Sequence, residues 1–200
     1  MLMIMISKGM NNHIIGVMGK KGSGKTVFVQ ESLKNMKRYI VVDTLHEYNG
    51  AIFYNWIDIV CFIDEVRDID FNIIYRPLND EDREEFFELI NVINNYTLVV
   101  EEIDFYCDSH NMHPELDHLT RYGRHYNRSL IWITRNPFEV NRFLTRQSDV
   151  LVTFKQTEPR DLDYFKKYNF NKEIETLKEY EYAFWGDEQI VTNVLNKKIA

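Results

Sequence analysis

The chain has 200 residues, 44% of them hydrophobic and 28% charged, which excludes a globally disordered protein and favours one domain over residues 1–200. Lysine and arginine number 24 and aspartate and glutamate 31, so the net charge of −7 argues against a protein that coats nucleic acid with its whole surface. The two cysteines are too few for a disulfide framework and indicate a reducing compartment. No run of about 18 apolar residues occurs, so we expect no transmembrane helix.

The first predicted unit is a strand, a glycine loop and a helix. Ile14, Ile15 and Val17 form a short apolar run that predicts a buried strand. Four of the eight glycines follow within nine residues, and apolar residues at helical spacing come next. We treat residues 1–12 as a flexible N-terminus.

The remaining elements continue this alternation. Further strands are predicted at Tyr39–Val42, Asn72–Tyr75, Thr97–Val100, Ser129–Thr134 and Asp149–Phe154. Helices are predicted from Asp80, over 114–125, over 137–146 and from Pro159. Residues 178–200 predict a hairpin and tail, with strands at Tyr180–Trp185 and Gln189–Val194. Alternating apolar strands and helices predict an α/β fold with a mostly parallel central sheet covered by helices.

The glycine loop matches a phosphate-binding motif. Residues 19–26 read GKKGSGKT and fit G-x-x-x-x-G-K-[ST] in full. Glycines let the backbone wrap around a phosphate, and the following helix N-terminus attracts the anion. We expect Lys25 to reach the β- and γ-phosphates of ATP and Thr26 to ligate Mg²⁺. The expected nucleotide-binding residues are Gly19, Lys20, Lys21, Gly22, Ser23, Gly24, Lys25, Thr26 and Val27.

Two glutamates follow the predicted strand Thr97–Val100. Successive strand residues point to opposite sides, so Glu101 and Glu102 must have different tasks. We assign Glu101 to the Mg²⁺ shell, through water, and Glu102 to polarising the attacking water. A second apolar run, Ile59–Ile63, ends in Asp64 and Glu65 and remains an alternative as the acidic strand end.

The order of five segments resembles the HerA/FtsK-type P-loop ATPases, which are ring-forming motors that move double-stranded DNA. The segments are residues 19–26, Val41–Tyr48 (VVDTLHEY), Val99–Asp104, Tyr122–Tyr126 with the strand after it, and Lys155–Asp161. Within this group the small size most resembles the genome-packaging ATPases of icosahedral viruses with an internal membrane. The resemblance covers roughly residues 13–165 and implies an ASCE, RecA-like P-loop NTPase fold.

The resemblance also implies two roles for arginines. Arg124 matches a Gly-Arg position before the sensor strand and is our candidate for a finger inserted into a neighbouring subunit's site, with Arg146 second. Arg135 stands where the family usually has a glutamine, in Thr134-Arg135-Asn136-Pro137. A fixed cation thus replaces a neutral donor and acceptor at the expected γ-phosphate sensor.

The function implied is ATP hydrolysis coupled to translocation of double-stranded DNA into a viral capsid. Expected partners are double-stranded DNA, other copies in a hexameric or pentameric ring, and a capsid or vertex protein, with the host cytoplasm or the virion as location. Two alternatives stay open: a small-molecule kinase with the same loop, and a phage assembly or export ATPase resembling zonula occludens toxin.

Two further patterns bear on these alternatives. Cys107, His110, His113 and His118 superficially resemble a metal cluster, but a polar loop is the favoured interpretation because zinc sites need four converging ligands.

The charge is unevenly distributed along the sequence. Residues 1–38 carry seven basic and one acidic residue, residues 121–146 six and one, and residues 39–120 three and nineteen. Localised basic stripes on an acidic body are compatible with contacts to phosphate.

Overall fold

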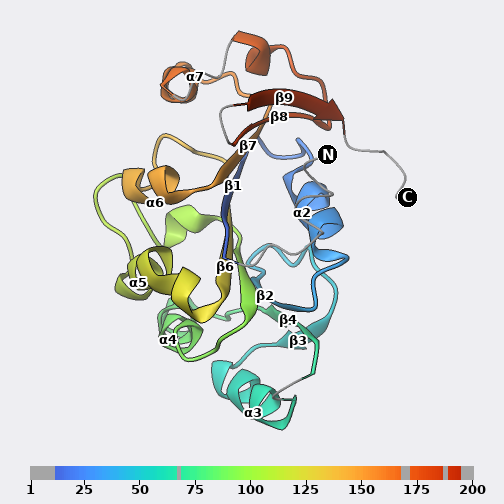
Figure 1. Cartoon of the computed structure of the whole chain (residues 1–200), viewed down its shortest axis with the longest axis vertical. Helices are drawn as coiled ribbons and strands as arrows, with labels where there is room; N and C mark the ends of the chain where they lie inside the picture. The colour runs from blue at the N-terminus through green and yellow to red at the C-terminus, as the bar shows by residue number, and fades with distance from the viewer. Residues whose placement is uncertain (1–11, 67–68, 168–171, 187–188, 195–200) are drawn as a thin grey trace.

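A nine-stranded sheet organises the computed structural model, which describes residues 12–66, 69–167, 172–186 and 189–194 (Figure 1). Its strand order is β3-β4-β2-β5-β6-β1-β7-β8-β9. The strands are β1 (Ile14–Met18), β2 (Arg38–Val42), β3 (Ala51–Phe53), β4 (Phe71–Tyr75), β5 (Tyr96–Val100), β6 (Arg128–Thr134), β7 (Val150–Phe154), β8 (Glu181–Gly186) and β9 (Gln189–Val194). Neighbours from β3 to β7 pair in parallel, whereas β8 and β9 continue the sheet antiparallel.

The described helices flank both faces of this sheet. They are α2 (Lys25–Leu33), α3 (Trp56–Val66), α4 (Asp80–Ile90), α5 (Pro114–Tyr122), α6 (Arg142–Gln147) and α7 (Pro159–Lys166), with 3-10 turns η1 (Ile103–Phe105), η2 (Gly123–Tyr126) and η3 (Lys172–Glu175). In Figure 1, α2 lies on one face of the sheet, and α4, α5 and α6 lie on the other.

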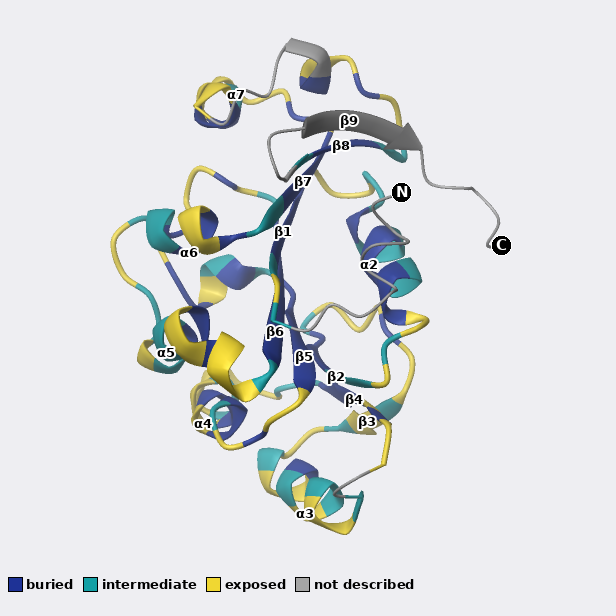
Figure 2. Ribbon diagram, viewed as in Figure 1, coloured by how far each residue is buried: buried dark blue, intermediate teal, exposed yellow. Residues whose placement is uncertain are grey.

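Alternating side chains divide the core into two layers. Leu98 and Val100 of β5 join the layer that includes residues of α4, α5 and α6, whereas Val99 joins the layer of α2 with Phe28 and Val29. All five residues of β5 are buried, as expected for a central parallel strand with both faces covered (Figure 2). The predicted α/β fold with a mostly parallel sheet and a C-terminal hairpin is therefore confirmed.

Two predicted elements differ from the structure. Residues 59–65 lie within helix α3, so Asp64 and Glu65 do not end a strand. Ile59, Phe62, Ile63 and Val66 recur at i, i+3, i+4 and i+7, and this helical face packs against the core. The helix predicted over 137–146 begins only at Arg142, because Asn141 is its N-cap and accepts a hydrogen bond from the Phe143 N–H at 2.9 Å.

Some predictions fall partly outside the described residues. Residues 1–11 of the expected flexible N-terminus and residues 195–200 of the expected tail are not described. The hairpin itself is confirmed, since β8 and β9 pair antiparallel from Glu181 opposite Val194 to Gly186 opposite Gln189. Among the described residues no helix is long and apolar enough to cross a membrane.

Candidate nucleotide site

The glycine loop joins the end of β1 to the start of α2. Gly19, Gly22 and Gly24 have positive φ values of 155°, 75° and 110°, which other residues rarely adopt. A Cβ on Gly19 would also lie 2.7 Å from the Cβ of Phe154, so the chain can turn this closely only at glycine. The buried hydroxyl oxygen of Ser23 has no hydrogen-bond partner among the described residues. The loop is thus a tight turn of exposed backbone at a helix N-terminus, which suits an anion.

Lys25 lies folded across the inside of this loop. Its Nζ donates hydrogen bonds to the carbonyl oxygens of Gly19 at 2.7 Å and Lys20 at 3.0 Å. Burial lowers the pKa of Lys25, with the Arg135 cation adding to the effect, while Glu102 and Glu101 oppose it. The ammonium group is therefore held at the loop by acceptors that a phosphate oxygen can replace.

Glu47 is a site residue that the sequence analysis did not assign. The hydroxyl of Thr26 donates a hydrogen bond to Oε2 of Glu47 at 2.5 Å, and Nε2 of Gln30 donates to its backbone carbonyl at 2.8 Å. The Glu47 backbone N–H in turn donates to Oδ1 of the fully buried Asp43 at 2.8 Å. Glu47 belongs to the segment Val41–Tyr48, one of the five segments that carry the resemblance. That segment was the signal in the sequence from which Glu47 could have been assigned to the site.

Glu101 follows β5 directly and lies almost fully buried. Its Oε1 accepts a hydrogen bond from the Tyr48 hydroxyl at 3.0 Å. Burial, against the lowering effect of the Tyr48 hydrogen bond and together with the neighbouring Glu47 and Asp43 carboxylates, raises the pKa of Glu101 to about 7. A nearby cation would reverse this balance and favour the charged carboxylate.

Glu102 follows Glu101 and forms an ion pair with Arg135. Oε1 of Glu102 lies 2.7 Å from a guanidinium nitrogen of Arg135, which follows β6 directly. Burial raises the pKa of Glu102, and the Arg135 cation opposes that rise. Glu102 also adopts a left-handed backbone conformation with φ of 49°, a conformation that costs a non-glycine residue about 1–2 kcal/mol. The backbone of the turn after β5 is thus strained at Glu102.

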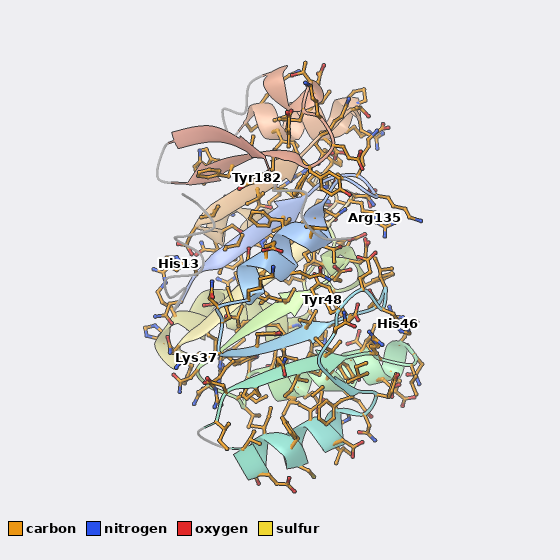
Figure 3. All side chains as sticks on the ribbon, turned by 90° about the vertical axis from the view of Figure 1, so that its right-hand side faces the viewer. His13, Lys37, His46, Tyr48, Arg135 and Tyr182 are labelled. Carbon is orange, nitrogen blue, oxygen red and sulfur yellow. The ribbon has the colours of Figure 1, made fainter. Side chains whose placement is uncertain are left out.

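These groups surround one cavity of about 320 Å³ at the carboxyl edge of the sheet. Its lining includes Lys21, Gly22, Gly24, Lys25, Thr26, Val27, Gln30, Leu45, Glu47, Glu101, Glu102, Ile133, Arg135 and Tyr180. Figure 3 shows Arg135, Tyr48 and His46 on the same side of the molecule, with His13 and Lys37 on the other. The structure therefore brings together the predicted loop, both glutamates and Arg135.

Arg124 lies at the opposite edge of the sheet. It belongs to η2, before β6, and its guanidinium lies 3.5 Å from Asp149, which also contacts His13. Its side chain is 69% exposed and does not line the cavity of its own chain. Action in a neighbouring subunit's site remains a prediction.

The alternative acidic pair and the cysteine and histidine cluster are not part of this cavity. Asp64 and Glu65 are exposed on α3. His113 caps α5 and contacts Glu84, with its Nε2 2.8 Å from a carboxylate oxygen. No group of three or more histidine, cysteine or acidic side chains among the described residues is arranged to hold a metal ion by itself.

Comparisons with solved structures give the fold a context. The genome-packaging NTPase B204 of Sulfolobus turreted icosahedral virus 2, in complex with AMP, is similar with a TM-score of 0.75 and 21% identity, covering 91% of this chain and 96% of that one. VirB4 of Thermoanaerobacter pseudethanolicus has a TM-score of 0.68 and 13% identity, covering 96% and 93%. The N-terminal domain of zonular occludens toxin from Neisseria meningitidis has a TM-score of 0.57 and 12% identity, covering 94% and 96%.

Sequence comparisons add nothing to this picture. No protein-family model matches the chain, and no curated protein matches it. At these identities the structural likeness concerns the fold, and it extends over nearly the full length of both B204 and this chain. The chain therefore has the fold of the P-loop ATPases that the sequence resemblance implied.

Proposed function

We propose that this chain is an ATP-hydrolysing motor that moves double-stranded DNA, as the packaging ATPase of a virus. The observation that carries the proposal is the single cavity that holds the loop lysine Lys25, the hydroxyl of Thr26 and the two glutamates after β5. Phosphoryl transfer needs these components together: a phosphate cradle, oxygen ligands for a metal and a carboxylate that orients water.

The oxygen atoms around Thr26 fit Mg²⁺. Magnesium prefers oxygen ligands and usually takes one or two carboxylates together with substrate phosphates and water. The Thr26 hydroxyl and the Glu47 carboxylate lie 2.5 Å apart, and Glu101 lines the same cavity. Thr26 and Glu47 would hold the ion, with Glu101 acting through water. When bound, Mg²⁺ would neutralise charge on the β- and γ-phosphates.

The chain's own residues then have separate tasks. Lys25 exchanges its backbone acceptors, the carbonyls of Gly19 and Lys20, for phosphate oxygens. Glu102 accepts a hydrogen bond from the attacking water and orients it toward the γ-phosphorus. Arg135 lies beside Glu102 and contacts the γ-phosphate, where a fixed cation stabilises negative charge.

The DNA-related part of the proposal is supported by likeness and by charge. B204 is a genome-packaging NTPase, and its structure and this chain overlap over almost their whole lengths. Basic residues are concentrated in residues 12–38 and 121–146, while the acidic excess lies in 39–120. Such locally basic segments suit contacts with DNA phosphates that are independent of sequence and weaken with salt. The proposal also includes a ring of five or six copies, in which Arg124 reaches a neighbour's site. A capsid or vertex protein anchors this ring in the host cytoplasm.

The kinase alternative is less well supported by the arginine positions. A lid needs several arginines around the phosphates, whereas Arg121, Arg124 and Arg128 precede or begin β6, at the edge opposite the loop. Likeness to the toxin domain keeps an assembly ATPase as the second candidate, because that domain has the same fold.

ATP turnover with and without double-stranded DNA tests the proposal. We expect turnover that rises when duplex DNA is added and falls at least about a hundredfold in Lys25→Ala. Lys34→Ala is a matched control, because Lys34 is an exposed lysine at the end of α2 that pairs with Glu31. Turnover that is unchanged in Lys25→Ala would refute the site, and phosphorylation of an added nucleoside would favour the kinase.

A further inference from the structure

Arg135 and Glu102 form an ion pair at the mouth of the proposed nucleotide site. They follow the neighbouring strands β6 and β5, so the parallel pairing of these strands brings them to the same edge. A guanidinium nitrogen lies 2.7 Å from Oε1 of Glu102, with 34% of the Arg135 side chain and 12% of the Glu102 side chain exposed. The pair is therefore better shielded from water than a surface salt bridge.

This pairing conflicts with the task of Glu102 in hydrolysis. A carboxylate oxygen that is held by a guanidinium is less available to accept a hydrogen bond from water, and the cation lowers its basicity. Arg135 cannot relieve the conflict by losing its proton, because a guanidinium remains charged in proteins. Glu102 is freed only if Arg135 finds another anionic partner.

The cavity provides the place for such a partner. Arg135, Glu102 and Lys25 line the same space, and the charges of Arg135 and Glu102 both act on the Lys25 ammonium. A terminal phosphate bound by Lys25 would bring oxygens that a guanidinium prefers, since arginine binds phosphate in a two-pronged geometry. A diphosphate lacks this group and leaves the ion pair intact.

We propose that Arg135 exchanges Glu102 for the terminal phosphate of a bound nucleoside triphosphate, so that Glu102 becomes a free base only when that phosphate is present. The inference rests on the proposed function and deepens it. The glutamine usual at this position in the family that the sequence resembles has no charge and would not form this ion pair. Arg135 is thus a positioning residue for Glu102 as well as a contact for the phosphate.

Nucleotide affinity tests this exchange without relying on turnover. We would measure by calorimetry the dissociation constants of ATPγS and ADP for the wild type, Glu102→Gln, Arg135→Gln and the double variant. In Glu102→Gln, Arg135 has no anionic partner to leave, so ATPγS should gain affinity relative to ADP by about tenfold. In the Arg135→Gln background, Glu102→Gln should alter the ratio of ATPγS affinity to ADP affinity by less than about twofold.

The double-mutant comparison separates exchange from simple repulsion. If Glu102 only repels the terminal phosphate, Glu102→Gln raises the ATPγS-to-ADP affinity ratio equally in both backgrounds, and the exchange is refuted. Arg135→Lys keeps the positive charge. In this background Glu102→Gln should therefore still raise the ATPγS-to-ADP affinity ratio, as it does beside Arg135. Arg160→Gln removes an exposed arginine outside the cavity and should leave the ratio unchanged.

The outcomes also distinguish the two proposals. If ATPγS does not bind to the wild type, the proposed function fails and the exchange fails with it. If ATPγS binds and ATP is hydrolysed but the effects of the two substitutions are additive, only the exchange is refuted.

Discussion

Replacing Arg76 with methionine should destabilise the chain and displace Glu47 from the proposed metal site. Nε of Arg76 lies 3.0 Å from Oδ2 of Asp43, a carboxylate with no exposed surface, and its Nη2 donates to the Tyr48 carbonyl at 2.8 Å. Asp43 in turn accepts the backbone N–H groups of Glu47 and Tyr48. The ion pair thus fixes the turn that carries Glu47 to Thr26.

The size of the effect follows from the buried charge left behind. Removing one partner of a buried ion pair costs about 3–5 kcal/mol. Asp43 would keep two backbone donors, so we expect the lower end, about 3 kcal/mol of unfolding free energy. For a chain of this length this corresponds to a fall of roughly 6–12 °C in melting temperature.

Denaturant unfolding and nucleotide binding measure the two consequences. The double variant Asp43→Asn with Arg76→Met removes the stranded charge and should recover part of the lost stability. In Arg76→Met alone, the gain in ATPγS affinity on adding Mg²⁺ should shrink several-fold, because Glu47 is no longer held near Thr26. A loss below about 1 kcal/mol with unchanged Mg²⁺ dependence would refute this reasoning.

Three other predictions concern the glutamates and Arg124. Glu102→Gln should retain ATP binding and reduce turnover at least about a hundredfold, whereas Glu65→Gln on α3 should not; the reverse pattern would invalidate the site. The pKa of Glu101 is raised from 4.5 to about 7, so without metal the folded chain binds a proton that the unfolded chain lacks, and stability falls as the pH rises from 4.5 to 7. Glu101→Gln should therefore raise the unfolding free energy at pH 8 by about 3 kcal/mol and have little effect at pH 4, as measured by urea unfolding. Adding Arg124→Ala subunits to wild-type subunits should lower ATP turnover by more than the fraction of variant subunits. A loss of turnover that is only proportional to this fraction would show that Arg124 does not act in a neighbouring subunit's site.

Local chemistry explains why the positions of the glycine loop and of the two acidic residues after β5 could be predicted from the sequence. The loop consists of consecutive residues, and its lysine needs only the loop's own carbonyls as partners. Glu101 and Glu102 follow a run of buried apolar residues, so their location at a strand end needs no tertiary information. The helix α3 could also have been predicted, because its apolar residues recur at helical spacing. The two acidic residues after an apolar run instead favoured the alternative of a strand.

Contacts between distant segments could not be predicted in the same way. The hydrogen bond between Thr26 and Glu47 depends on the turn held by Asp43 and Arg76, which are 33 residues apart. The pairing of Glu102 with Arg135 depends on β5 and β6 being neighbours in the sheet. One feature was available from the sequence: Arg124 precedes a parallel strand and Arg135 follows it, so the two must lie at opposite edges.

Movement along duplex DNA tests the central proposal most directly. A short third strand bound to a DNA duplex reports the arrival of a translocating protein by its release. We expect ATP-dependent release with wild-type protein, no release with Lys25→Ala, and weaker activity as salt increases. ATP hydrolysis without any release of the third strand, under conditions where the protein binds the duplex, would contradict a DNA motor.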